Sequence, residues 1–400
     1  MGRHRSPLKQ ALDVKSRLFF LSRLLTLGLP SLRRFWSFYP DLGFPSADRV
    51  QLIHQSLYQH PWMSAHYEEA RKFVLNHNVD SPAISLWSEP HTTERYVAIV
   101  RGVVVPGHSG TPIDPVTARQ ISSDKNGASN WSRGRPSISA LTRRQLSADL
   151  TLVIPKLNHF GHLLTDFLMP LFFALQMIGF SEGQQLNIVT SRRPNALILA
   201  FIEAVKQAGY EVTHIEGQLW EEIHVPRLLH ATTHTQNLEL KFATPEAIPF
   251  ARDHLLKALP PVSGNTARRI FLLRGNTKTR QVNGEAELAH KLEQIGFRTL
   301  VGKWSNLAEQ ITAFRDADII VGAHGAGLAN ILWSKPQATL IELFANNARK
   351  TTGLHWASAV GANYIGLAGS DEKQMQCFSI NPDQIFSTIK SIIAQTEQGH

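Results

Sequence analysis

A histidine and an aspartate lie four residues apart near the middle of the chain, in a spacing that suits proton transfer. In a helix, His162 and Asp166 would lie one turn apart on the same face. A carboxylate beside an imidazole at the rim of a cleft can act as a general base with an orienting partner. Alternatively, His159, His162 and Asp166 are a set of side chains that could bind a metal ion. In a purely structural interpretation, which the spacing alone favours, Asn158 caps a helix and His162 is half-buried.

Small residues follow the apolar stretch 318–321, where a strand runs into a tight turn and a helix begins. In a parallel sheet this turn lies at the carboxyl end of a strand, where ligands bind. Three glycines could let the backbone approach a phosphate, and His324 would project from the turn; the glycines are Gly322, Gly325 and Gly327. Alternatively, the glycines serve packing and His324 caps the helix. The pattern is neither a Walker A sequence nor a GxGxxG fingerprint, which disfavours nucleotide hydrolysis and dinucleotide binding.

Two arginines lie after a second apolar strand, 269–273, in a polar loop. Arg274 and Arg280 suit a diphosphate because a guanidinium contacts two oxygens at once. Glu342, at the end of the strand 339–343, could hold a ribose hydroxyl. The alternatives are solvated arginines and an edge carboxylate in a salt bridge.

The elements that must position these residues alternate between strand-like and helix-like patterns, which predicts an α/β fold with parallel sheets. Strands are expected at 150–154, 186–189, 211–214, 269–273, 298–300, 318–321 and 339–343, and helices at 161–178, 194–208, 285–295, 306–317 and 325–333. Residues 46–105 mix helical periodicity with a β-rich end, and 106–148 are an irregular connection. Pro260–Gly264 is the expected linker between two halves.

Several motifs occur in the order found in glycosyltransferase family 61. They are Asn158-x-x-Gly161-His162-x-x-x-Asp166-x-x-x-Pro170, Arg274, Arg280-x-x-Asn283-x-Glu285, Glu309–Gln310 with Phe314, His324–Gly325–Ala326–Gly327–Leu328-x-Asn330, Pro336 and Ile341–Glu342. Residues 158–342, extending towards Tyr364, therefore resemble this family, whereas residues 1–90 do not. His159 stands where an aromatic residue is expected.

The resemblance implies a GT-B arrangement of two facing Rossmann-like domains with an interdomain cleft, and a nucleotide-sugar donor, here a UDP-sugar, that reacts with inversion. The expected catalytic residues are Asp166 as base and His162 as its partner. The expected donor-binding residues are Arg274, Arg280, His324, Gly325, Ala326, Gly327 and Glu342. The sequence offers no clear Asp-x-Asp metal site, so we expect neither a metal nor a further cofactor. The acceptor would be a glycan or a lipid-linked oligosaccharide in polysaccharide biosynthesis, and the enzyme a hexosyl-, pentosyl- or N-acetylhexosaminyl-transferase.

Two other classes of function stay open at this point. One is a metal-dependent hydrolase that uses His159, His162 and Asp166. The other is a non-catalytic protein that binds a glycan or a nucleotide. The expected organisation is a basic tail at 1–45, an acceptor-side α/β domain at 46–260, a nucleotide-sugar-binding domain at 265–372 and a C-terminal helix at 373–400.

Composition and charge narrow the classes of partner. The chain has 400 residues, 43% of them hydrophobic, and a single cysteine, Cys377, which excludes a disulfide scaffold and a thiolate-rich metal site. The formal net charge is +9, but residues 1–34 carry eight Lys and Arg against one Asp, so the rest is close to neutral and nucleic acid is not an expected partner. The tail has no secretory cleavage site, and its apolar run is too short to span a membrane. We expect a cytoplasmic protein whose residues 1–34 either bind an anionic membrane surface, on the inner face, or remain a solvated tail.

Overall fold

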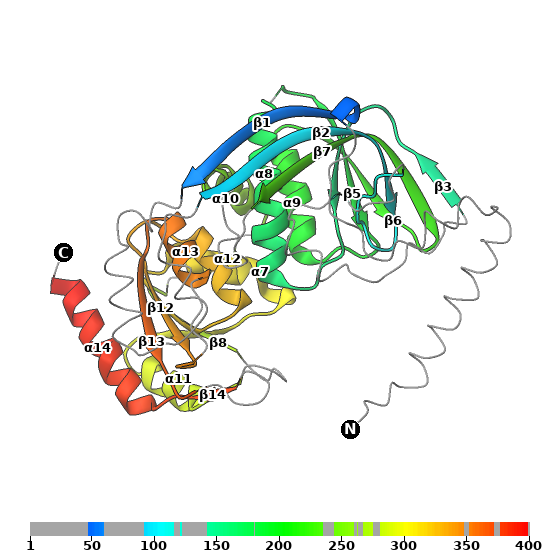
Figure 1. The fold of residues 1–400 in the computed structure, drawn as a ribbon. Coiled ribbons are helices and arrows are strands. Elements are labelled where there is room, and N and C mark those ends of the chain that lie inside the picture. The colour runs from blue at the N-terminus through cyan, green and yellow to red at the C-terminus, as the bar shows by residue number, and fades with distance from the viewer. Residues whose placement is uncertain are drawn as a thin grey trace, which may run out of the picture.

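The computed structural model describes residues 47–59, 92–115, 121, 142–179, 181–234, 244–259, 262, 267–274, 281–347, 352–371 and 377–398. The predicted tail, most of the predicted linker and Arg280 lie outside these residues. Where it is described, the chain forms two large sheets with helices between and around them (Figure 1). The expected α/β class is confirmed.

The N-terminal half contains a seven-stranded mixed sheet in the order β1-β2-β7-β4-β5-β6, with β3 beside β7. Its strands are β1 (Val50–Gln59), β2 (Thr92–Pro106), β3 (Thr142–Gln145), β4 (Leu150–Ile154), β5 (Gln185–Ser191), β6 (Glu211–Gly217) and β7 (Glu221–His234). β4, β5 and β6 are parallel neighbours, as the alternating pattern predicts. The helical periodicity expected from residue 46 onward is wrong for residues 50–59, because β1 pairs antiparallel with β2 along its whole length. The long antiparallel strands β2 and β7 make this half more than a series of β–α units.

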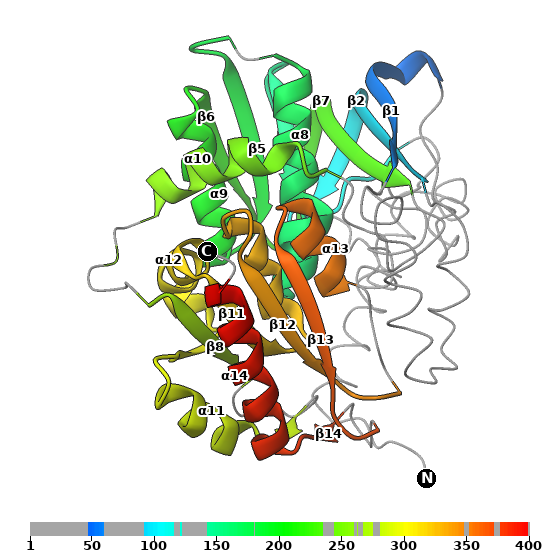
Figure 2. The same ribbon diagram turned by 90° about the vertical axis from the view of Figure 1, so that its left-hand side faces the viewer.

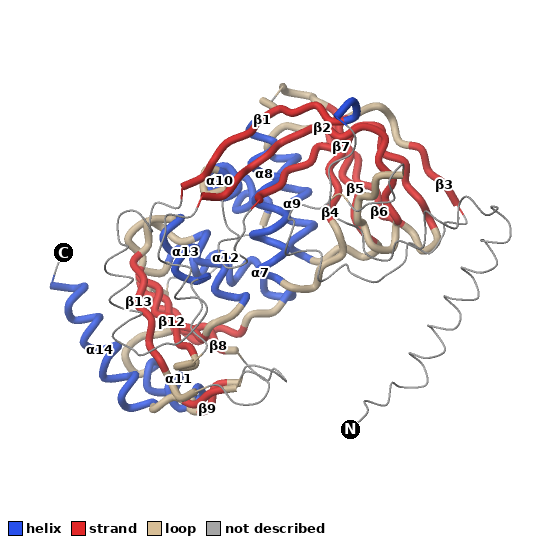
Figure 3. Tube along the Cα trace, in the orientation of Figure 1, coloured by secondary structure: helices blue, strands red, loops and turns tan. Residues whose placement is uncertain are grey.

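This sheet curls towards one of its faces, and helices pack on the other face. The end of β2 meets the end of β6, where a Cβ on Gly217 would lie 2.4 Å from Cα of Gly107. Valines and isoleucines of β2, β4, β5 and β7 fill the inside of the curl. The helices α7 (Phe160–His162), η2 (Leu163–Leu168), α8 (Met169–Met177), α9 (Ala196–Gln207) and α10 (Ala247–Ala258) lie between the two sheets (Figure 3).

The C-terminal half contains a five-stranded parallel sheet in the order β10-β8-β11-β12-β13. Its elements are β8 (Arg269–Leu273), α11 (Glu285–Glu293), β10 (Arg298–Val301), η3 (Trp304–Asn306), α12 (Leu307–Asp316), β11 (Ile319–Ala323), η4 (Ala326–Trp333), β12 (Thr339–Phe344), α13 (Thr352–Ala359), β13 (Asn363–Ala368) and α14 (Pro382–Gln398), with β9 (Val282–Asn283) pairing β14 (Phe378–Ser379). Numbered along the chain, the five large strands follow the order 2-1-3-4-5 of a doubly wound sheet. α11 and α14 cover one face (Figure 2), and α12, η4 and α13 cover the other.

The expected helix at 325–333 forms as the 3₁₀ helix η4. Leu328 N–H donates to the Gly325 carbonyl and Ser334 N–H to the Ile331 carbonyl, three residues back in both cases. In a 3₁₀ helix every third side chain lies on one face. Trp333, at the end of η4, is completely buried.

The helices of the two halves share one apolar core, so the halves are packed together and not merely linked. The largest cluster of buried side chains runs from Leu163 and Phe172 in the N-terminal half to Phe314 and Trp333 in the C-terminal half. The helix Phe160–Met177 is long and apolar enough to cross a membrane by length and composition, but most of it is buried in this core.

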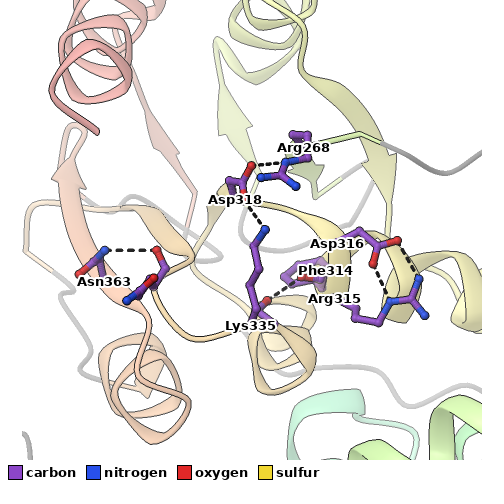
Figure 4. A network of polar contacts seen from close by, with 9 residues as sticks. Arg268, Phe314, Arg315, Asp316, Asp318, Lys335 and Asn363 are labelled. Carbon is purple, nitrogen blue, oxygen red and sulfur yellow. Dashed lines mark hydrogen bonds and ion pairs between the residues drawn. The ribbon is translucent and has the colours of Figure 1, made fainter. Parts of the chain in front are cut away.

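The amino-terminal edge of the C-terminal sheet is held together by charged side chains (Figure 4). Asp318 precedes β11 and forms ion pairs with Arg268, before β8, and with Lys335, before β12. These contacts join the starts of three adjacent strands. Arg274 and His324, which the sequence predicts to bind the donor, follow strands at the other, carboxyl edge of this sheet.

Candidate active site

The helix that carries His162 and Asp166 follows β4 directly. Its first N–H groups are capped by His159 and not by the predicted Asn158: His162 N–H donates to His159 Nδ1 at 3.3 Å. Asparagine is a frequent residue at this position, but here His159, with its extended backbone and proximal ring nitrogen, takes the role. The rings of His159 and His162 lie 4.3 Å apart, between their centres.

His162 and Asp166 form the pair that their spacing predicts. His162 Nδ1 lies 2.8 Å from Asp166 Oδ2, and the Thr165 hydroxyl lies 2.7 Å from Asp166 Oδ1. The side chain of His162 is 28% exposed and that of Asp166 is 8% exposed. The carboxylate therefore lies behind the imidazole, as seen from solvent. Such a carboxylate fixes the orientation and tautomer of the ring.

A wider helical turn brings Asp166 to this position. Residues 163–168 are π-helical, and Met169 N–H donates to the Leu164 carbonyl five residues back. Pro170, which has no N–H, lies just after this turn at the start of α8. The Thr165 hydroxyl also lies 2.9 Å from the Gly161 carbonyl. Single π-helical turns inside helices are frequent at functional sites.

Arg274 and the turn after β11 meet at the carboxyl edge of the C-terminal sheet. β8 lies between β10 and β11 in the sheet. Along the chain, β8 is followed by β10 on one side of it, and the chain then crosses to β11 on the other side. This is the switch point at which doubly wound sheets bind ligands. Arg274 Nη1 donates to the His324 carbonyl at 2.7 Å. A Cβ on Gly325 would lie 1.7 Å from that nitrogen, so any larger residue there would displace the guanidinium.

The other two glycines of the turn serve packing. A Cβ on Gly322 would lie 2.9 Å from Leu328 Cδ2, and one on Gly327 would lie 2.8 Å from Leu272 Cδ2. Both glycines therefore let η4 pack closely on the sheet. The packing alternative from the sequence applies to these two, and Gly325 alone lies against a cationic side chain.

His324 is held from beneath by a buried acid. His324 Nδ1 lies 2.6 Å from Glu342 Oε1, and the Tyr364 hydroxyl donates to Glu342 Oε2 at 2.7 Å. The Glu342 side chain is 1% exposed. Burial, together with the neighbouring Glu342 carboxylate, raises the pKa of Tyr364 well above its usual value. Both carboxylate oxygens therefore contact protein side chains, and the ribose contact expected of Glu342 stays a prediction.

The two clusters meet where the first helical turn of one half touches the other half. A Cβ on Gly161 would lie 3.4 Å from both Cα and Cβ of Ala326. His162 follows Gly161, and His324 lies two residues before Ala326. The carboxyl ends of β4 and β11 therefore lead into the same region. This region holds the His162–Asp166 pair from one half and the turn with Arg274 and His324 from the other.

Comparison with known proteins finds a family model that matches part of the chain. Residues 160–341 match the family described as Glycosyltransferase 61. They belong to the glycosyltransferase 61 family. The match covers the His162–Asp166 pair, Arg274 and the turn at His324, and it ends one residue before Glu342. No curated protein matches the chain.

Other motif residues of this glycosyltransferase position the site without facing it. Asn330 in η4 donates to Gln310 Oε1 at 3.3 Å, which ties η4 to α12. Glu285, the first residue of α11, accepts a hydrogen bond from Arg274 N–H at 3.0 Å. Glu309 pairs with Arg298. Asn330, Gln310 and Glu285 are buried, and their contacts explain why polar residues occur at these positions, whereas Glu309 and Arg298 are partly exposed.

The structure describes every predicted site residue except Arg280. Arg280 lies outside the described residues, so its place beside Arg274 stays a prediction. No three His, Cys, Asp or Glu side chains gather closely enough to hold a metal ion in the part of the chain that the structure describes. His159 Nδ1, one of the donors in the metal alternative, accepts a helix N–H instead.

The sequence did not indicate three residues that support the site. Tyr364 was only the outer limit of the family resemblance, and nothing near it in sequence marks a partner for Glu342. Arg252 in α10 donates to the Leu332 and Ser334 carbonyls at 3.0 and 2.5 Å, across the boundary between the halves. Gly353 lies against Glu342, where a Cβ would come within 2.3 Å of Oε2. All three contacts join segments far apart in sequence.

Proposed function

We propose that this glycosyltransferase moves a sugar from a nucleotide-sugar, most simply a UDP-sugar, to a hydroxyl of a glycan acceptor with inversion at the anomeric carbon. The observation that carries the proposal is the Gly161–Ala326 contact, which brings the His162–Asp166 pair beside the turn of Arg274 and His324. The proposal includes a GT-B-type organisation in which residues 46–260 serve the acceptor and residues 265–372 serve the donor. The carboxyl ends of parallel strands from both halves lead into this region, which is where such sheets bind ligands.

On the donor side, positive charge would stabilise the departing diphosphate. Arg274 lies at the switch point with its Nη1 on the His324 backbone, so its guanidinium is held in place before a ligand arrives. Arg280 belongs to the same polar loop in the sequence and would join it. Preorganised donors of this kind lower the barrier because they face the charge that develops as the bond to the leaving group breaks.

On the acceptor side, we propose that the His162–Asp166 pair receives the hydroxyl proton. The acceptor oxygen forms the new bond to the anomeric carbon, while the bond from that carbon to the diphosphate breaks and leaves its electron pair on the diphosphate. The smaller burial of His162 supports a contact between its ring and the acceptor, with Asp166 orienting it. This division of roles reverses the one expected from the sequence, and variants at both residues can distinguish the two.

The acceptor and the location of the enzyme belong to the proposal as well. A lipid-linked oligosaccharide or a growing polysaccharide would suit an enzyme that docks on an anionic membrane from the cytoplasmic side through residues 1–34, the charged part of its tail. We propose no metal for the transfer, since Arg274 and His324 can supply cationic groups to the diphosphate.

A donor screen tests the proposed function. The full chain is incubated with UDP-, GDP-, ADP- and CMP-sugars, and release of the free nucleotide is measured together with the anomeric configuration of the product by NMR. We expect one class of donor, with UDP as the nucleotide, to be consumed with inversion. The proposal fails if no donor is consumed and no nucleotide binds, or if the product retains the configuration of the donor.

A further inference from the structure

A chain of three polar side chains crosses three adjacent strands behind the proposed donor site. His324 follows β11, Glu342 lies in β12 and Tyr364 lies in β13, and these strands are neighbours in the sheet. The contacts are 2.6 Å from His324 Nδ1 to Glu342 Oε1 and 2.7 Å from the Tyr364 hydroxyl to Glu342 Oε2. His324 and Tyr364, at the two ends of this chain, are partly exposed, and Glu342 between them is buried.

The surroundings of Glu342 supply a hydrogen-bond donor and partial positive charge to this buried side chain. A buried carboxylate is costly unless donors and positive charge face it. The Tyr364 hydroxyl is one donor, and the raised pKa of Tyr364, which results from its burial and from Glu342, keeps it protonated. The first turn of α13 also lies against the acid at Gly353, and a helix N-terminus carries partial positive charge. The remaining oxygen lies 2.6 Å from His324 Nδ1, where an ionised Glu342 can accept a hydrogen bond from a protonated Nδ1.

We propose that Glu342 and Tyr364 are positioning residues that stabilise His324 as an imidazolium, so that its Nε2–H donates to a diphosphate oxygen of the nucleotide. The inference rests on the proposed function and deepens its donor site. A neutral imidazole held through Nδ1–H would present a lone pair at Nε2, which repels a phosphate oxygen. A protonated ring instead adds a cation and a donor. In this arrangement Glu342 acts through His324 and does not touch the ribose.

The other charged groups around His324 leave this role to Glu342. From β8, the Arg274 guanidinium donates to the His324 backbone carbonyl and disfavours a second cation nearby. From the N-terminal half, the His162–Asp166 pair approaches through the Gly161–Ala326 contact, and Asp166 already faces His162. Glu342 is the acid in direct contact with the ring of His324. Nucleotide affinity should therefore fall as the pH rises and His324 loses its proton.

The experiment is a titration of the full chain with UDP by calorimetry between about pH 5.5 and about pH 8, on the wild type and on E342Q, Y364F and H324Q. Glutamine keeps the shape of Glu342 but removes the charge, so E342Q should bind about tenfold or more weakly at about pH 8 and within about twofold of wild type at about pH 5.5. Y364F should show a smaller loss with the same trend, and H324Q should show little pH dependence. Y210F is the matched control, because Tyr210 is a buried tyrosine of the N-terminal half, and it should bind UDP as the wild type does.

The outcomes separate this inference from the proposed function. If the wild type binds neither UDP nor another nucleoside diphosphate, the proposed donor site fails. If the wild type binds UDP and both E342Q and Y364F bind it equally well at every pH, the inference is overturned while the donor site stands. A loss of affinity that is equal at all pH values, with a lowered unfolding temperature, would show that the two residues are only structural and would also overturn it.

Discussion

Gly161 and Ala326 touch across the boundary between the two halves, at a spacing that leaves room for one methyl group. A Cβ on Gly161 would lie 3.4 Å from Cα and Cβ of Ala326, which is ordinary van der Waals contact. We therefore expect G161A to keep its transfer activity and to gain up to about 0.5–1 kcal/mol of stability, because alanine favours a helix over glycine. G161L should cost about 1–3 kcal/mol through overpacking and should abolish transfer by moving His162 away from the donor side. Thermal unfolding and nucleotide release measure both, and a G161L variant with wild-type turnover would contradict the contact's role.

The proton acceptor can be identified by a pair of variants. D166N keeps the shape of the carboxylate but supplies a poor partner for His162 Nδ1–H, and H162A removes the more exposed member of the pair. Loss of a general base typically costs about 10²–10⁴-fold in rate. We expect both variants to lose transfer to this degree while UDP affinity, measured by calorimetry, stays near that of the wild type.

The relative size of the two losses decides the roles. An H162A loss at least as large as that of D166N supports His162 as the acceptor of the proton. A D166N loss far larger than that of H162A would return the role to Asp166. D316N is a suitable control, because Asp316 pairs with the adjacent Arg315 at an exposed position. Wild-type turnover in both D166N and H162A would contradict any catalytic role of the pair.

The dependence of the donor site on Arg274 predicts that two different substitutions have the same effect. R274A removes a charge-assisted contact worth about 1.5–3 kcal/mol, so UDP affinity should fall about tenfold or more. G325A should weaken UDP binding to a similar degree, because its Cβ would displace the guanidinium. The double variant should be little worse than either single one, since both remove the same contact. R268A, which changes an arginine at the opposite edge of the sheet, should bind UDP normally.

Removal of divalent metal tests how the leaving group is stabilised. Since Arg274 and His324 are proposed to face the diphosphate, we expect EDTA to leave both UDP affinity and transfer unchanged. Nucleotide release is measured with and without chelator, followed by addition of Mg²⁺ or Mn²⁺. A strong loss that added metal restores would favour metal assistance instead.

The parts of the fold that were predictable from the sequence are those with local signals. The strand Arg269–Leu273 is apolar and ends in polar loop residues, and it forms within the predicted bounds. The pairing of His162 with Asp166 was predictable from helical spacing, although the π-helical turn that carries Asp166 was not. β1 was not predictable in the same way, because its strand conformation depends on backbone partners in β2 that lie about forty residues further along the chain.

The least predictable parts of the candidate site are its long-range contacts. Nothing in the sequence around Tyr364 indicates that its hydroxyl contacts Glu342, because the two meet only when β12 and β13 pair in register. The same holds for Gly161 and Ala326, which come from different halves. The glycines after β11 show the opposite difficulty, because packing and ligand approach require the same residue type. The positions of Leu272, Leu328 and Arg274 in the structure distinguish the glycines that serve packing from the one that lies against a cationic side chain.

Arg252 should stabilise the packing of the two halves. It reaches from α10 to the buried carbonyls of Leu332 and Ser334, at the end of η4 opposite the Gly161–Ala326 contact. R252M would leave these carbonyls without their cationic donor, at a cost of about 1–3 kcal/mol. We expect a lower unfolding temperature and weaker transfer, while R315M, which removes an exposed arginine, should change little. An R252M variant as stable as the wild type would show that the halves are held by apolar packing alone.

The basic tail provides a test of how the enzyme meets its acceptor. Eight Lys and Arg and one Asp lie within residues 1–34, whereas the whole chain has a net charge of +9. Each basic residue near an anionic leaflet adds about 1 kcal/mol, so several together suffice for peripheral attachment. The full chain should therefore sediment with vesicles of anionic lipid at low salt and dissociate at high salt. Deletion of residues 1–34 should release it while transfer to a soluble acceptor continues. If the intact chain stays in the supernatant at low salt, or if the truncated chain unfolds, the tail serves the fold and not the membrane.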